Sequence, residues 1–446
     1  MIWSRFNILY VSENEYFLYN SRLNTFLKVD KDSFLKLRQV ENEEIKVDAL
    51  SPDFYEYLVS KKIIVSKTED DSFINQMRYL KLKRSFMTPS LELIITPTLA
   101  CNFACPYCYE SNLPTKPMNE DIQNQLISFI NSHKNRVNSL SINWHGGEPL
   151  IAYPSMKSIL NKIENYSEIP LKNHRMVTNG YLLSRDKVSL LKKYHINYVQ
   201  ITIDGKKEIH NKIRRHKQGL PTYDVIIENI DYLSTEIPNC LVGIRVNIQK
   251  ENKDEYPEIY AELMAKWKNR KNCVVYPAIV INQGSCSVSC LSAHEQSQFY
   301  VDLYKKYNFD VDFMPSVQVG SCDGIYENSY IVASNGDLFK CWADVGINSR
   351  KVGDLKNGIT NWEFVSGYML GSDKFVDSKC LKCHIFPICS GGCNRFRIEQ
   401  QYNGTPYDVC PTDEKGLHDY LDIIYKKQKN GEYVHCKKST STGYYK

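Results

Sequence analysis

From residue 91 onward, apolar segments alternate with amphipathic ones in a regular order. The apolar segments lie at residues 91–97, 140–144, 175–178, 198–203, 242–248 and 274–280. The amphipathic segments lie near residues 119–133, 155–166, 184–194, 223–235, 254–268 and 293–307. Six strand–helix units in series predict a parallel α/β sheet with right-handed crossovers. We expect this sheet to curl into a partial parallel (β/α)6 barrel similar to a TIM barrel.

Polar motifs stand where the first four of these strands end. In chain order they are Cys101-Asn-Phe-Ala-Cys105-Pro-Tyr107-Cys108, His145-Gly146-Gly147-Glu148-Pro149, Thr178-Asn179-Gly180 and Thr202-Ile203-Asp204-Gly205, with His210 and Arg214 shortly after. In parallel barrels the loops after the carboxyl ends of the strands carry the chemistry. The motifs therefore fall where a barrel would place its active site.

Length and composition limit the class of protein. A chain of 446 residues is too long for one ordinary core and indicates two or three domains. The net charge of +5 comes without a strongly basic block, which argues against a general nucleic-acid binder. No apolar run reaches the ~18–20 residues of a membrane span, and the first residues lack a signal-peptide pattern. We expect a cytoplasmic protein that binds neither nucleic acid nor membrane.

The 15 cysteines are clustered rather than spread along the chain. Three lie between Cys101 and Cys108, and seven lie between Cys322 and Cys410. Disulfides are rare in a reducing cytosol, so pairing does not explain these groups. Clustering of this kind indicates metal or cluster ligation.

The first group suits an iron–sulfur cubane. Three thiolates in one tight loop can hold three corners of the cubane and leave one iron open to a small molecule. The spacing Cys101-x3-Cys105-x2-Cys108 resembles the signature of the radical S-adenosylmethionine (SAM) superfamily. The resemblance implies reductive cleavage of SAM to a 5′-deoxyadenosyl radical that abstracts a substrate hydrogen. It also implies an electron donor of the flavodoxin or ferredoxin type.

The other strand-end motifs resemble the SAM-binding motifs of the same superfamily. In Gly-Gly-Glu-Pro, glycines let the backbone approach SAM, and the carboxylate faces its ammonium group. By resemblance, Thr202 would contact the ribose or carboxylate of SAM, and the Arg214 guanidinium would pair with that carboxylate. The implied SAM-binding residues are Tyr107, His145, Gly146, Gly147, Glu148, Pro149, Asn179, Thr202, Asp204 and Arg214. Each motif alone could also be an ordinary turn.

The second group of cysteines has its own spacing. Cys322-x13-Gly336-x4-Cys341 is followed by Cys380-x2-Cys383-x5-Cys389-x3-Cys393 and then by Cys410. This order resembles the SPASM extension of radical SAM peptide and protein maturases, which carries two auxiliary 4Fe–4S clusters. The resemblance implies that Cys322, Cys341 and Cys393 hold auxiliary cluster I. It assigns auxiliary cluster II to Cys380, Cys383, Cys389 and Cys410, so that three 4Fe–4S clusters and SAM are expected.

One position departs from some relatives, which have a further cysteine shortly before the place of Cys322. Here that stretch is Met314-Pro-Ser-Val-Gln-Val-Gly-Ser. Either auxiliary cluster I has an open iron, or Cys286 or Cys290 supplies a fourth ligand; loop closure permits the second alternative. Zinc is an alternative metal for all of these thiols.

Residues 1–85 have the pattern of a small separate unit. Strands are expected at 6–11, 16–20 and 25–29, and helices at about 31–40 and 51–60, whereas the charged residues 66–88 suit a linker. This outline is similar to the winged-helix elements of peptide natural-product pathways, which bind a leader peptide as an added strand. Winged helices also bind DNA, but residues 1–60 lack a basic recognition helix.

The expected layout has four parts. They are a winged-helix-like leader-recognition domain at 1–85, a radical SAM partial barrel at 86–310, a cysteine-rich SPASM domain at 311–430 and a tail at 431–446. The leading hypothesis is a maturase that joins residues of a ribosomally made precursor peptide through a thioether or carbon–carbon cross-link.

Two alternatives remain beside this hypothesis. One is a maturase of a folded protein that oxidises a side chain as sulfatase maturases do; the other is a zinc- or cluster-stabilised binding protein without catalysis. Sulfatase maturases typically have an Asp base after the second extension cysteine, where this chain has Trp342. Asp344 is the candidate base that could replace it.

Overall fold

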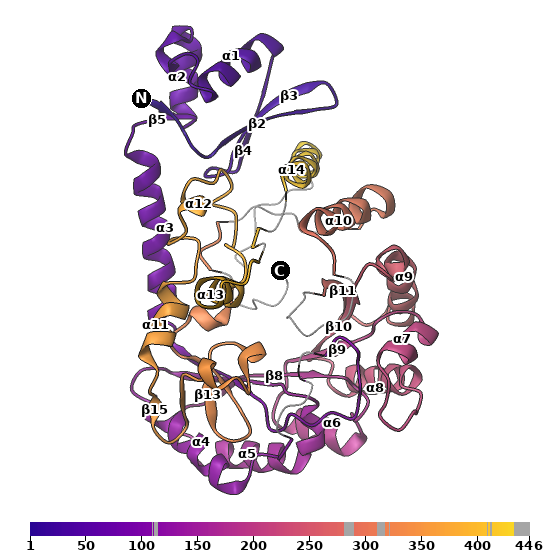
Figure 1. Cartoon of the computed structure of the whole chain (residues 1–446). Coiled ribbons are helices and arrows are strands. Elements are labelled where there is room, and N and C mark those ends of the chain that lie inside the picture. The colour runs from indigo at the N-terminus through magenta and orange to yellow at the C-terminus, as the bar shows by residue number, and fades with distance from the viewer. Residues whose placement is uncertain are drawn as a thin grey trace. The chain divides into compact units, whose positions relative to one another are not determined.

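The fold is given by a computed structural model that describes residues 1–108, 110, 115–280, 290–309, 317–320, 322–407, 409–410 and 413–431. The chain divides into two compact units. The sheet unit comprises residues 87–292 and 326–366, and the terminal unit comprises residues 1–86, 293–325 and 367–446. Their elements are labelled in Figure 1.

Six parallel strands form the centre of the sheet unit. They are β6 (Ser90–Ile95), β7 (Ser139–Trp144), β8 (Leu171–Thr178), β9 (Tyr198–Thr202), β10 (Leu241–Ile248) and β11 (Cys273–Ile279). They pair side by side in chain order, from β6 to β11, and every pair is parallel. Each strand overlaps the segment predicted for it, which confirms a large parallel α/β sheet.

Helices connect these strands and lie outside the curved sheet in Figure 1. They are α4 (Glu120–Ser132), α5 (Tyr153–Tyr166), α6 (Arg185–Lys193), α7 (Lys207–Ile213), α8 (Tyr223–Glu236) and α9 (Tyr256–Lys266). Alternate strand residues such as Val242, Ile244 and Val246 are fully buried. Apolar burial on this scale stabilises by about 25 cal/mol per Å² and holds the strand ends in place.

The sheet extends beyond the predicted strands. The strand β12 (Ser329–Val332) pairs in parallel with β6, and β13 (Asp337–Phe339), β14 (Gly353–Asp354) and β15 (Gly358–Ile359) follow as antiparallel neighbours. These four short strands lie within the range given above for the cysteine-rich domain, where the sequence predicts no strands. Strands of two to four residues are too short to show an alternation of apolar and polar residues in the sequence.

The N-terminal part of the terminal unit has the predicted pattern. Its elements are β1 (Ile2–Trp3), β2 (Asn7–Ser12), β3 (Glu15–Asn20), β4 (Thr25–Val29), α1 (Lys31–Glu41), α2 (Pro52–Ser60) and β5 (Ile64–Val65). The strands β2, β3 and β4 form an antiparallel sheet, and β1 pairs with β5. Asp30 caps α1 by accepting a hydrogen bond from Ser33 N at 2.9 Å.

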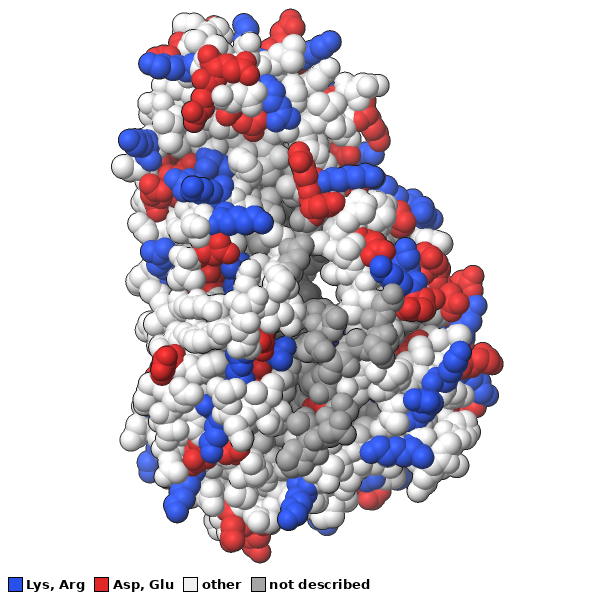
Figure 2. All heavy atoms as spheres, in the orientation of Figure 1, with Lys and Arg blue, Asp and Glu red and all other residues white. Residues whose placement is uncertain are grey.

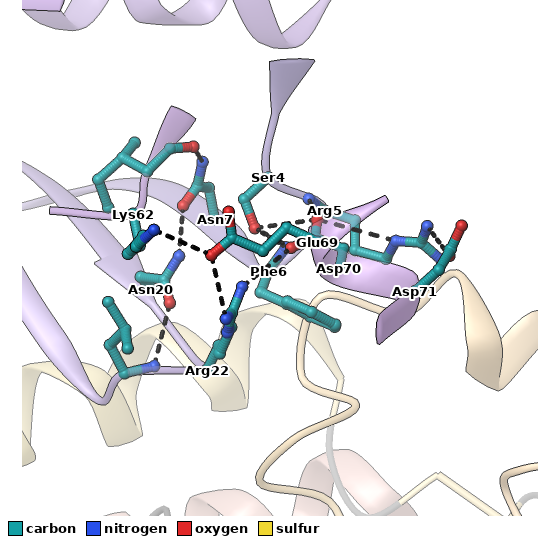
Figure 3. Close-up of polar contacts among 12 residues, drawn as sticks. Ser4, Arg5, Phe6, Asn7, Asn20, Arg22, Lys62, Glu69, Asp70 and Asp71 are labelled. Atoms are coloured by element: carbon teal, nitrogen blue, oxygen red, sulfur yellow. Dashed lines mark hydrogen bonds and ion pairs between the residues drawn. The ribbon is translucent and has the colours of Figure 1, made fainter. Parts of the chain in front are cut away.

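Residues 66–88 are mostly a helix, α3 (Glu69–Phe86), rather than the expected linker. Asp70 is buried in its first turn and accepts hydrogen bonds from Ser4 Oγ at 3.0 Å and Arg5 N at 2.8 Å (Figure 3). Further along, Ile74 and Met77 are buried in an apolar cluster with Phe6 and other residues of the terminal unit. This helix was not predicted from the sequence because only a narrow stripe of its surface is buried and most of its residues are charged or polar.

The remaining elements of the terminal unit come from the second half of the chain. They include α10 (Ala293–Tyr307), α12 (Ser378–Leu381), α13 (Asn394–Asn403) and α14 (Glu414–Lys429), while α11 (Trp362–Leu370) spans the border of the units. Ile8 and Phe17 of the N-terminal sheet share a core with Leu421 and Ile424 of α14. The compact units therefore differ from the predicted sequence ranges, because the N-terminal sheet, α10 and the later cysteine region share one unit.

One face of the molecule shows how its surface charges are distributed. On the face drawn in Figure 2, Lys and Arg side chains are intermixed with Asp and Glu. Within the described ranges, none of the helices has the length and apolar character needed to cross a membrane.

Candidate active site

The first cysteine loop follows β6 and is held by backbone pairing. Ala104 N donates to Arg215 O at 2.8 Å, and Lys217 N donates to Asn102 O at 2.9 Å, on either side of a bridge between Phe103 and His216. A segment more than 100 positions away in sequence thus fixes the loop that carries Cys101, Cys105 and Cys108. The three predicted ligands therefore come from an anchored loop at a strand end.

The thiols of this loop are partly buried. Burial raises the pKa of Cys101 to about 12 and also raises the pKa values of Cys105 and Cys108, so a bound cation is needed to keep all three as thiolates. Among the described residues, no three Cys, His, Asp or Glu side chains converge as a single metal ion requires. A zinc ion with Zn–S bonds of about 2.3 Å would gather its ligands in this way, whereas a cubane binds each thiolate at a different iron. Three thiols on one anchored loop match the donor set that would hold three irons of a 4Fe–4S cluster and leave the fourth iron open.

Gly146 and Gly147 let two loops touch. A Cβ on Gly146 would lie 2.3 Å from Thr98 O, and one on Gly147 would lie 2.5 Å from Ala100 O. Gly146 also has a φ of +122°, which side chains disfavour. The glycines therefore press the turn after β7 against the residues that lead into the cysteine loop, a contact that sequence reasoning did not anticipate.

Glu148 is fully buried and is held by protein donors. Its carboxylate accepts hydrogen bonds from Thr178 Oγ1 at 2.8 and 2.9 Å, from Asn179 N at 2.7 Å and from Leu150 N at 3.0 Å. Burial raises the pKa of this carboxyl group, while the donors lower it. Glu148 thus joins the ends of β7 and β8, and Pro149 begins the short 3-10 helix that follows.

A polar network centred on Tyr107 connects the cysteine loop with the ends of β9 and β10. The Tyr107 hydroxyl donates to Asp204 and accepts from Arg214 Nη1 at 2.6 Å and from Asn247 Nδ2 at 3.2 Å. Arg214 Nη1 also lies 3.5 Å from the Asp204 carboxylate. Burial raises the pKa of Tyr107 well above its ordinary value, so the hydroxyl keeps its proton.

Several buried polar atoms around this network have no hydrogen-bond partner among the described residues. They are Asn102 Nδ2, Asn143 Oδ1, His145 Nδ1, Asp204 Oδ1, His210 Nε2 and Arg214 Nε. Buried polar atoms in folded proteins are nearly always paired, so this concentration indicates that a polar ligand completes the site. Donors and acceptors of both kinds suit the ammonium, carboxylate and ribose groups of SAM.

His145 and Asn179 complete the predicted set near the cysteines. Asn179 Nδ2 donates to Asn102 Oδ1 at 2.8 Å and lies 3.9 Å from Cys101 Sγ. Burial lowers the pKa of His145 to about 4, so the ring is neutral at pH 7. The ring stacks on Trp342 with centroids 5.9 Å apart.

The last two predicted residues of the sheet unit are buried. Thr202 lies at the end of β9, opposite Arg245 in the register with β10. Asp344, the candidate base, ends the 3-10 helix that begins at Trp342, directly after Cys341. The stacking of Trp342 on His145 places this helix next to the predicted SAM site.

Three residues of the site were not predicted in their roles. Asn102 accepts a hydrogen bond from Asn179, Thr178 donates one to Glu148, and Asn247 donates one to Tyr107. Asn247 belongs to no recognisable motif, and its signal was only its position at the end of the fifth strand. Thr178 was seen only as part of a turn motif.

The second group of cysteines is divided between the two units. In the terminal unit, Cys380, Cys383, Cys389 and Cys410 line one cavity of about 500 Å³. Burial, and then the neighbouring Cys393, raise the pKa of the Cys322 thiol to about 11. Cys341 and Cys290 belong to the sheet unit, and Cys286 lies outside the described residues.

The fold and the site together define an enzyme that binds SAM at an iron–sulfur cluster and acts by radical chemistry. The radical SAM superfamily matches residues 95–263, so the chain contains a radical SAM domain and is a radical SAM enzyme. It is 23% identical over 351 residues to the cysteine-type anaerobic sulfatase-maturating enzyme of Clostridium perfringens (strain 13 / Type A), a match that covers 70% of this chain and 91% of that protein.

Two solved structures share this fold. A structure of anSMEcpe with bound AdoMet matches with a TM-score of 0.60 and 16% identity, covering 78% of this chain and 97% of that one. Streptococcus suis SuiB matches with a TM-score of 0.52 and 19% identity, covering 92% of this chain and 100% of that one. Other structures of these two proteins contain a Kp18Cys peptide and the precursor peptide SuiA, respectively.

Proposed function

We propose that this radical SAM enzyme is a maturase of a ribosomally made peptide and installs a thioether or carbon–carbon cross-link. The observation that carries the proposal is the three-stranded N-terminal sheet, which has an open edge at β4. The match to SuiB extends over 92% of the chain, against 78% for anSMEcpe, and SuiB has been solved with a bound precursor peptide, which supports a peptide substrate.

The open edge follows from the hydrogen bonds of the sheet. Leu9 O on β2 accepts from Arg38 Nη2 at 2.9 Å, so Leu9 faces outward, away from its partner Leu18. Alternation then turns the backbone of Leu27 toward β3 and the backbone groups of Phe26 and Lys28 outward. In the described part of the chain, these outward groups of β4 have no backbone partner. An extended leader peptide could add there as a fourth strand.

The proposed cofactor set is SAM with three 4Fe–4S clusters. Cys101, Cys105 and Cys108 would hold the first cluster. The later cysteines would hold the auxiliary clusters as their spacing implies, namely Cys322, Cys341 and Cys393 for one and Cys380, Cys383, Cys389 and Cys410 for the other. SAM bound at the first cluster would supply a carbon radical once an electron arrives from a flavodoxin- or ferredoxin-type donor.

The chain's own residues orient and shield this chemistry. Arg214 and Asp204 present unpaired guanidinium and carboxylate atoms to the ligand, while Tyr107 holds the two side chains together. Glu148 fixes the two strand ends beneath them. Burial of these groups keeps water from the radical. Asp344 is the proposed base that accepts a proton from the substrate.

Side-chain oxidation of a folded protein is the second candidate, favoured by the match to a sulfatase-maturating enzyme over 70% of the chain. The products separate the candidates. A cross-link leaves a peptide lighter by two hydrogen atoms whose fragments stay joined in tandem mass spectrometry, whereas oxidation to formylglycine leaves an aldehyde that reacts with a hydrazide.

The experiment begins with a search for a short, cysteine-bearing reading frame beside this gene. The enzyme is then produced anaerobically together with the peptide that such a frame encodes, and the peptide is analysed by mass spectrometry. The chain with Lys28→Pro loses one outward N–H of β4, and Lys28→Ala keeps it. We expect cross-linking with wild type and Lys28→Ala and a strong loss with Lys28→Pro. An unmodified peptide with the fully loaded wild-type enzyme, or an aldehyde product, would contradict the proposal.

A further inference from the structure

Arg397 of α13 touches a cysteine sulfur. Its Nη2 lies 3.2 Å from Cys380 Sγ, and its side chain is only 9% exposed. Two other bonds fix the guanidinium: Nη1 donates to Asp377 Oδ2 at 2.6 Å, and Nε donates to Gly391 O at 2.8 Å. Every nitrogen of this side chain therefore has an assigned partner, and one of them is a proposed cluster ligand.

Asp377 binds both the guanidinium group of Arg397 and the backbone next to Cys380. While Oδ2 binds Arg397, Oδ1 accepts from Lys379 N at 2.8 Å and from Cys380 N at 3.3 Å. The same carboxylate therefore orients the guanidinium and the backbone that carries the sulfur. The negative charge of Asp377 partly offsets the positive charge of Arg397, but the hydrogen bond from Arg397 to the cysteine sulfur remains.

A second cation lies beside the same cysteines. Lys374 is 2% exposed, and its Nζ donates to Gln318 O at 2.6 Å, to Phe386 O at 2.6 Å and to Cys389 O at 2.7 Å. Carbonyl oxygens offset part of the desolvation of an ammonium group but none of its charge. Both cations line the cavity that the four cysteines share.

We propose that Arg397 is a positioning residue that raises the reduction potential of the cluster held by Cys380, Cys383, Cys389 and Cys410. One-electron reduction adds a negative charge to a cluster. An N–H donor and a cation at one of its sulfurs stabilise that charge, and hydrogen bonds to sulfur are among the factors that set cluster potentials. The inference rests on the assignment of auxiliary cluster II under the proposed function.

The test uses a chain in which only these four proposed ligands remain, with Cys101, Cys105, Cys108, Cys322, Cys341 and Cys393 changed to Ala. After anaerobic reconstitution, iron content and the midpoint potential are measured in a titration with dithionite followed by electron paramagnetic resonance (EPR). In this background we expect Arg397→Gln to keep four irons and to shift the midpoint to a more negative potential. Arg78→Gln is the matched control, because Arg78 donates to Phe375 O at 3.0 Å in the same unit. Its midpoint should not move.

The outcomes separate the two proposals. If the parent chain binds no four-iron cluster, the cluster assignment itself is wrong. If the cluster is present and Arg397→Gln has the parent's midpoint, the inference about Arg397 is overturned. Should Arg397→Gln lose iron, the Arg397→Lys variant decides. A midpoint potential more negative than that of the parent supports the inference, and a midpoint equal to that of the parent overturns it. If the six-fold variant does not fold, the titration is repeated in the otherwise unchanged chain on the signal that Cys383→Ser removes.

Discussion

Glu148 Oε2 accepts a hydrogen bond of 2.7 Å from the backbone N–H of Asn179. These residues follow the second and third parallel strands, and Asn179 in turn donates to Asn102 in the cysteine loop at 2.8 Å. Three of the loops that form the site are thus linked through one buried carboxylate and one amide. The site is preorganised by the protein before any ligand binds.

The first prediction concerns Glu148→Gln. An amide cannot accept from all of the donors that converge on the carboxylate, so at least one buried donor loses its partner. We expect the free energy of unfolding to fall by about 1–3 kcal/mol and the affinity for SAM to weaken. Anaerobic denaturation and calorimetric SAM titration measure both. Glu168→Gln is the control, because Glu168 forms an exposed ion pair with Lys134. Equal losses in the two variants would refute the role of Glu148.

The second prediction concerns Tyr107→Phe. Without the hydroxyl, Asp204 loses a donor and Arg214 an acceptor inside a buried network, so we expect a loss of about 1–3 kcal/mol and weaker SAM binding. Isothermal titration with SAM is the measurement. Tyr166→Phe, at an exposed position, is the control. SAM affinity equal to that of wild type would show that the network does not position the ligand.

The third prediction concerns pH and His174. Trp144 Nε1 donates to His174 Nε2 at 2.8 Å, and burial lowers the pKa of His174 from 6.5 to about 4. Between pH 6.5 and 4 the unfolded state binds a proton that the native state excludes, so stability falls as pH falls, by up to about 1.4 kcal/mol per pH unit. Denaturation at pH 5, 6 and 7 should show that the free energy of unfolding depends less on pH in His174→Gln than in wild type. His195→Asn, a control at an exposed position, should keep the pH dependence of wild type. Parallel curves for wild type and His174→Gln would contradict the assignment.

The fourth prediction concerns the shared core of the terminal unit. Phe6 is fully buried and packs with Phe375 and Phe386, and Arg5 Nη1 donates to Leu381 O at 3.2 Å within the proposed cluster loop. We expect Phe6→Ala to cost about 3–5 kcal/mol and to reduce iron retention by the later cysteines. Iron content per chain after gel filtration is the readout, with the exposed Leu23→Ala as control. Full iron in Phe6→Ala would show that the N-terminal sheet is independent of the cysteine region.

The six parallel strands could be predicted because most of them carry three or more consecutive apolar residues or a clear alternation, and because they recur between amphipathic segments. Sequence reasoning found the strand-end motifs because glycines and cysteines at fixed spacing are rare by chance. It could not find α3, whose buried stripe includes Asp70 and Lys81, because polar residues buried by tertiary partners look exposed in a sequence. It could not assign Asn247 or Arg397 either, since their roles depend on neighbours far away in the chain.

The role given to Glu148 also shows this limit. The motif predicts a carboxylate that faces SAM, and the structure adds that its oxygens accept hydrogen bonds from Thr178, Asn179 and Leu150. A motif identifies which residue matters, whereas the partner of each atom depends on the packing of the strand ends.

The most direct test of the central claim is the EPR spectrum of the reduced cluster at Cys101, Cys105 and Cys108 with and without SAM. It is best measured in a chain whose seven later cysteines, from Cys322 to Cys410, are changed to Ala, so that one cluster contributes. The account predicts that SAM changes the g-values of this cluster. A spectrum that stays the same at saturating SAM would contradict an open iron and with it the proposed chemistry.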